Sequence, residues 1–153
     1  MTENVFLYDN KVSLNMPTEF VSVEDKEKYF AAGKPDFVYA EKDTGALISV
    51  TLTENDIDNA KIEERIMEYY EIYRRSVPNF SNSKIAKNKT KSGKEMAAFY
   101  YTSTAPNRDL YNFFILSSVD GKELTITMHC NAQNIPDYGV KFMHFLNSID
   151  ILD

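Results

Sequence analysis

The 153-residue sequence has no tryptophan, a single cysteine and no long apolar run. Because Cys130 stands alone, the chain cannot form an internal disulfide. No stretch approaches the roughly 20 apolar residues that a membrane-spanning helix needs. The first residues show neither the basic nor the apolar part of a signal peptide. We therefore expect a cytoplasmic protein that does not insert into membranes, although an exported protein without its signal would look the same.

Basic side chains are also scarce. The chain has 17 Lys and Arg against 23 Asp and Glu, which gives a formal net charge of -6. Nucleic-acid binding depends on Lys and Arg that neutralise phosphates, so we expect no nucleic-acid partner. The hydrophobic fraction of 43% is ordinary for a globular protein. The length fits one domain, residues 1–153.

Motifs for catalysis are missing as well. The sequence contains no glycine-rich phosphate loop, no serine elbow and no zinc-ligand spacing. His129 and Cys130 are neighbours, but adjacent strand residues point to opposite faces of a sheet, so a thiol–imidazole pair is not expected. Cys130 should instead lie in the core as a small apolar residue. We expect no catalytic residue and classify the protein as not an enzyme.

No metal or cofactor is expected either. Two histidines are too few for a histidine-based metal site, and His144 should point to solvent. Glu54, Asp56 and Asp58 lack the spacing and the glycine of a calcium loop. Negative charge at this place favours the start of the helix that follows.

The last third of the chain, residues 110–152, is the most apolar part, and it predicts a β-hairpin followed by a helix. A two-residue loop at Asp120-Gly121 pairs residues whose numbers sum to 241. One face of this hairpin is then fully apolar and should be core. The other face is only half apolar, so we expect it to be partly covered: it carries Asn112, Phe114 and Leu116 beside Thr125, Thr127 and His129.

Further strand pairs and two helices follow from the same patterns. Hairpins are predicted around Asp9-Asn10, Asp43-Gly45 and Ser92-Gly93. Tyr29 and Phe30 should anchor the irregular segment before the second hairpin. A first helix over residues 60–75 and a closing helix that starts near Pro136 each carry an apolar stripe: Ile62, Ile66, Tyr69 and Tyr73 in the first, and Tyr138, Phe142, Phe145 and Ile149 in the second. The order predicts an α+β fold, a mostly antiparallel sheet covered by two main helices.

Two segments resemble the Mog1/PsbP-like group, which includes the DcrB-type bacterial proteins. The opening Lys11–Phe20 is similar to its strand-Pro-x-x-aromatic start, and Phe142–Ile149 is similar to its closing helix. Phe20 stands where many relatives carry Trp. The resemblance implies an α/β/α sandwich and mostly non-enzymatic members, which bind GTPases, photosystem subunits or apolar segments of secreted toxins. No functional residue of that group carries over to this sequence.

Three candidate interaction surfaces remain. Phe114 and Leu116 lie on the half-apolar face, and Tyr70 lies off the stripe of the first helix, where it is either a contact for a partner or an ordinary half-exposed tyrosine. Lys87, Lys89 and Lys91 share one strand face; they either dock an acidic partner or protect an exposed edge strand.

These surfaces favour a non-catalytic protein-binding, chaperone or adaptor module. We expect its partner to be another protein, with a homodimer as one form of that contact. The alternative is a small-molecule carrier or an enzyme with a pocket between sheet and helices. Such a pocket would be closed, and it would contain His129, Asn112 and a carboxylate.

Overall fold

The computed structural model describes residues 1–26 and 34–153, so the expected packing of Tyr29 and Phe30 lies outside the described part. Seven strands form one large antiparallel sheet. In spatial order they are β3 (Val21–Ser22), β4 (Phe37–Ala40), β5 (Leu47–Asp56), β9 (Lys122–Asn131), β8 (Arg108–Val119), β7 (Glu95–Ala105) and β6 (Ser81–Lys89).

A smaller antiparallel sheet lies beside it. It contains β1 (Thr2–Leu7), β2 (Val12–Pro17) and β10 (Asp150–Ile151), with β2 in the centre. The first and last segments of the chain are therefore neighbours, since Ile151 pairs with Val12. The two main helices are α1 (Ile62–Ser76) and α2 (Ile135–Ser148). No helix within the described ranges is both long and apolar enough to span a membrane.

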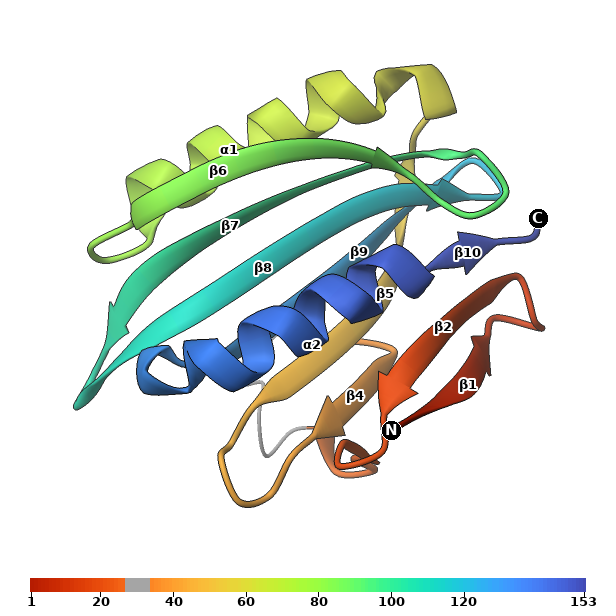
Figure 1. The fold of residues 1–153 in the computed structure, drawn as a ribbon. Helices are drawn as coiled ribbons and strands as arrows, with labels where there is room; N and C mark the ends of the chain where they lie inside the picture. The colour runs from red at the N-terminus through yellow and green to blue at the C-terminus, as the bar shows by residue number, and fades with distance from the viewer. Residues whose placement is uncertain (27–33) are drawn as a thin grey trace.

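The two helices lie on opposite faces of the large sheet (Figure 1). On one face α2 packs on β8, where the rings of Phe113 and Phe142 lie 6.1 Å apart. On the other face α1 packs on β7 and β8, and the ring of Tyr73 lies 5.5 Å from that of Phe99. The predicted α+β fold with two covering helices is confirmed.

The local sequence explains where α1 begins and ends. A short 3₁₀ turn (Asn59–Lys61) precedes it, and the Asp58 side chain accepts a hydrogen bond from the Ala60 N–H at 3.2 Å. The predicted apolar positions Ile62 and Ile66 are buried against the sheet. Two arginines occupy the last turn, where positive charge complements the helix dipole.

The predicted hairpin registers are confirmed. Tyr111 pairs with Cys130 across β8 and β9, which is the register that a two-residue loop at Asp120-Gly121 requires. Asp120 and Gly121 both have positive φ angles of 51° and 77°, as such a tight turn demands. In the first hairpin Leu7 pairs with Val12, as expected.

The expectation of a partly covered second face is wrong for Phe114 and Leu116. Phe114 is 3% exposed and Leu116 0% exposed, because both lie beneath α1. The reason is the aromatic stripe of the helix: Tyr69 and Tyr73 pack on the Phe114 ring at 4.8 and 5.3 Å. These two residues therefore form part of a second core and offer no surface to a partner.

Candidate functional site

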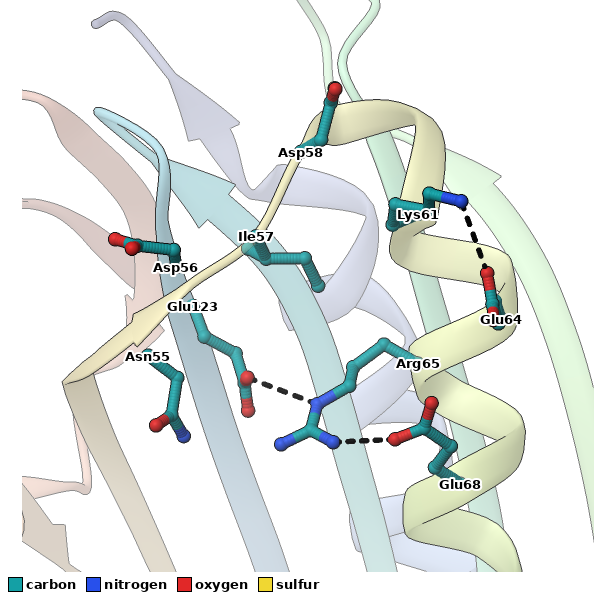
Figure 2. Close-up of a pocket in the computed structure, with 9 residues that line it drawn as sticks. All are labelled: Asn55, Asp56, Ile57, Asp58, Lys61, Glu64, Arg65, Glu68 and Glu123. Carbon is teal, nitrogen blue, oxygen red and sulfur yellow. Dashed lines mark hydrogen bonds and ion pairs between the residues drawn. The ribbon is translucent and has the colours of Figure 1, made fainter.

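A pocket of about 440 Å³ lies where the chain leaves β5 and enters α1. Five carboxylates and two cationic side chains contribute to its wall, so the pocket is acidic. Its lining residues come from the end of β5, the first turns of α1 and the start of β9 (Figure 2): Asn55, Asp56, Ile57, Asp58, Lys61, Glu64, Arg65, Glu68 and Glu123.

The floor of this pocket contains a buried charged group. The Glu123 side chain on β9 is only 1% exposed. Its carboxylate accepts a hydrogen bond from Arg65 Nε at 3.1 Å and another from the Tyr69 hydroxyl. Since Arg65 and Tyr69 are one helical turn apart on α1, both point from the helix toward the same carboxylate (Figure 2 shows the arginine contact).

The ionisation of these groups follows from their contacts. Hydrogen bonds to Glu68 and then to Glu123 raise the pKa of Arg65. Burial, and next the hydrogen bond to Glu123, raise the pKa of Tyr69 to about 12. Near neutral pH the arginine is therefore a cation and the tyrosine a neutral donor. Together they neutralise and satisfy the buried carboxylate, as a buried charge requires.

The rim of the pocket is formed by exposed carboxylates. Asp56 is 87% exposed and pairs with Lys122 at 2.6 Å, while Glu68 is 52% exposed and pairs with Arg65 at 2.6 Å. Glu64 meets Lys61 at 3.5 Å. Such solvent-exposed pairs contribute little to stability, so each rim carboxylate can exchange its cation for another one at small cost.

The lining of this pocket carries more negative than positive side chains. No group of histidine, cysteine and carboxylate side chains in residues 1–26 and 34–153 could hold a metal ion. The pocket lining contains no cysteine, histidine, serine or threonine. The acidic rim does, however, create a negative potential at a concave surface, which attracts cationic groups.

The tyrosine and lysine candidates lie outside this pocket. Tyr70 is half-buried: its ring packs on Phe80 and Phe99 at 5.4 and 5.5 Å, and its hydroxyl lies 2.6 Å from Ser83 Oγ. Tyr70 therefore belongs largely to the packing of α1.

The three candidate lysines, Lys87, Lys89 and Lys91, are only partly placed as expected. Lys87 and Lys89 lie on β6 and are exposed, but each has an acidic neighbour: Lys87 pairs with Glu63, and Lys89 with Glu95 at 3.6 Å. Lys91 is not on the strand face, because β6 ends at Lys89. The Thr90 N–H bonds to the Lys94 carbonyl, which closes the turn at this point.

The histidine and the cysteine are separated as expected. Cys130 lies in the core that α2 covers, and burial raises the pKa of its thiol to about 11. His129 faces the other side, opposite Asn112 on β8. Asn112 donates to Ser103 Oγ at 2.9 Å, and no carboxylate in the described part bonds to Asn112 or His129. Aromatic rings fill the space between α1 and the sheet, so the closed pocket that the carrier or enzyme alternative expects does not lie there.

Sequence reasoning missed Glu123 and Arg65. The hairpin register places Glu123 on the same face as Phe114, and Arg65 lies beside the apolar stripe of the first helix. A carboxylate on a sheet face and a cation at the edge of the covering helix are a signal for an ion pair. That signal becomes readable only when it is known which helix covers which face.

No protein-family model matches the sequence, and no curated protein matches it. Solved structures do share its fold. The cyanobacterial PsbP of Synechocystis sp. PCC 6803 has a TM-score of 0.65 at 9% identity, covering 98% of this chain and 92% of its own. Mycobacterium tuberculosis LpqN, which is involved in cell envelope biogenesis, has a TM-score of 0.61 at 12% sequence identity, and the match covers 100% of this chain and 91% of LpqN. The Saccharomyces cerevisiae Ran-binding protein Mog1p has a TM-score of 0.56 at 9% sequence identity, and the match covers 100% of this chain and 96% of Mog1p. The chain thus has a Mog1/PsbP-like fold.

Proposed function

We propose that the protein is a non-catalytic protein-binding module that docks a basic segment of its partner in the acidic pocket at the start of α1. The observation that carries this proposal is the exposed carboxylate rim over the Arg65–Glu123 pair. The rim can accept a lysine or arginine side chain from a partner. The Glu123 carboxylate in the floor already has Arg65 and Tyr69 as partners, so it does not need a cation from the ligand.

The shape of the pocket supports the same function. Its walls come from three segments that are fixed by the sheet and the helix, and the Ile57 N–H bonds to the Gly121 carbonyl at 2.8 Å, which holds the β5–α1 connection against the β8–β9 turn. A preformed site loses little conformational entropy on binding. The Ran-binding protein Mog1p shares this fold, which supports protein recognition as the function.

A short lysine-rich synthetic peptide tests the proposal. Calorimetry should detect binding that weakens with added salt, because exposed charges are screened. Glu64→Gln with Glu68→Gln should weaken binding about tenfold. Glu24→Gln with Asp43→Asn removes the same charge from exposed positions outside the pocket lining and should leave affinity unchanged. Equal losses in the two double variants would mean that net charge alone attracts the peptide and would refute the pocket.

A further inference from the structure

The outer edge of β6 is open. β6 is the last strand of the large sheet, and no strand in the described part of the chain pairs with its outer side. From Lys84 to Lys89 it pairs with β7 in continuous register, and the only irregularity lies before Lys84. These six residues of regular edge strand span roughly 20 Å, and the backbone groups of every second residue point away from β7, where another chain can reach them. The Lys89 N–H already donates to Asn88 Oδ1 at 2.9 Å, so it has to leave this side chain before it can bond to an added strand.

Lysines surround this edge on both faces of the sheet. Lys87 points to the α1 face, where it pairs with Glu63. Lys84 is an odd number of residues away and so points to the opposite face. Within residues 1–26 and 34–153, Lys84 and Lys91 form no ion pair, and the two pairs made by Lys87 and Lys89 are highly exposed and therefore weak.

The face of the sheet opposite α1 leaves room beside β6. There α2 lies over other strands and reaches β6 near one end, where Asn88 and Asn147 lie 3.5 Å apart (Figure 1). Lys84 and Ala86 are exposed on this face. Side chains of a strand added to β6 would not meet a covering helix there.

We propose that β6 binds an extended acidic segment of another polypeptide as an additional strand of the large sheet. Backbone hydrogen bonds along the edge would provide affinity, and carboxylates opposite the lysines would provide specificity. The lysines disfavour a second copy of this chain, because pairing centred near Lys87 places like charges opposite each other. The other long edge, β1, carries Glu3 and no lysine, so the same segment is not attracted there.

A short synthetic peptide that alternates threonine and glutamate is the probe. It matches the alternation of Lys87 and Lys89 along one face, and we expect the full chain to bind it at low salt. Backbone amide signals of β6 should shift in NMR spectra, while those of β1 should not. The same peptide with N-methylated backbone keeps its charge but cannot donate hydrogen bonds, and it should not bind.

Matched variants separate the edge from bulk charge. Lys87→Gln with Lys89→Gln should weaken binding about tenfold. Lys42→Gln with Arg75→Gln removes the same charge from exposed sites outside β6 and should have no effect. Tight binding of the N-methylated peptide, absence of binding or shifts on β1 would each overturn the proposal. So would self-association of the chain through β6, which would make a second copy the occupant.

Discussion

The buried Glu123 carboxylate on β9 lies 3.1 Å from Arg65 Nε on α1, and this contact links the sheet to the helix that covers it. Among residues 1–26 and 34–153, removing the cation leaves the buried carboxylate with only the Tyr69 hydroxyl as a donor. Arg65→Met should therefore lower the free energy of unfolding by about 2–4 kcal/mol, since a broken buried pair is strongly destabilising.

The exposed Arg75 on the same helix provides the control for this variant. Arg75→Met should change the free energy of unfolding by less than about 0.5 kcal/mol, because surface substitutions rarely do more. Urea denaturation measures both. If Arg65→Met proves as mild as Arg75→Met, the pair does not hold α1 on the sheet.

Phe99 is the centre of the aromatic cluster beneath α1. It is 0% exposed and stacks on Phe114 at 5.1 Å between ring centroids. Phe99→Ala should destabilise the fold by about 3–5 kcal/mol, because truncation of a buried aromatic ring leaves a cavity. Ile72→Ala, on the exposed side of α1, should have little effect. Thermal unfolding of the two variants distinguishes a sealed core from a loosely covered face.

His129 should make stability depend on pH. Burial, and next the charge of Arg108, lower the pKa of His129 to about 4. As pH falls, the His129 imidazole binds a proton near pH 6.5 in the unfolded chain, but only near pH 4 in the folded protein. Stability from this group is therefore complete above pH 6.5 and is lost as pH falls toward about 4.

A variant without the His129 imidazole isolates this contribution. Glutamine at position 129 cannot titrate. Between pH 6.5 and about pH 4, the free energy of unfolding of His129→Gln should therefore fall by about 1–3 kcal/mol less than that of the original chain. Denaturant unfolding at several pH values gives both curves. Parallel curves would show that carboxylates alone cause the acid sensitivity.

The thiol of Cys130 should be unreactive in the folded protein. It is buried, and its raised pKa of about 11 leaves little thiolate at pH 8. Iodoacetamide should label it only after denaturant is added, which mass spectrometry can follow. Rapid labelling without denaturant would mean that the core under α2 opens readily.

The sequence predicts which strand residues pair far better than it predicts which helix covers which face of the sheet. Leu7 with Val12 and Tyr111 with Cys130 follow from turn length alone, since a tight turn sets the register of both strands. Which helix covers Phe114 does not follow, because long-range packing depends on the whole sheet. The pocket at Glu123 is hidden for the same reason.

Short or irregular pairings are also invisible to sequence patterns. β10 has two residues, Asp150 and Ile151, and such a segment is too short to show strand alternation. It becomes a strand only because α2 delivers it to the edge of β2. The end of β6 at Lys89 is another case. The run of lysines continues to Lys91, but the strand stops at Lys89 because the chain turns at Thr90.

The central position of β8 in the large sheet has a consequence for how the molecule opens. β8 is paired on both edges, and every residue from Asn112 to Val119 is buried. Its backbone amides can meet solvent only when the whole sheet comes apart, so their hydrogen-exchange rates report the global unfolding equilibrium. The amides of β6 and β1, each at an open edge, will exchange through small local fluctuations, so slow exchange along the chain will trace a line from β9 through β8 to β7.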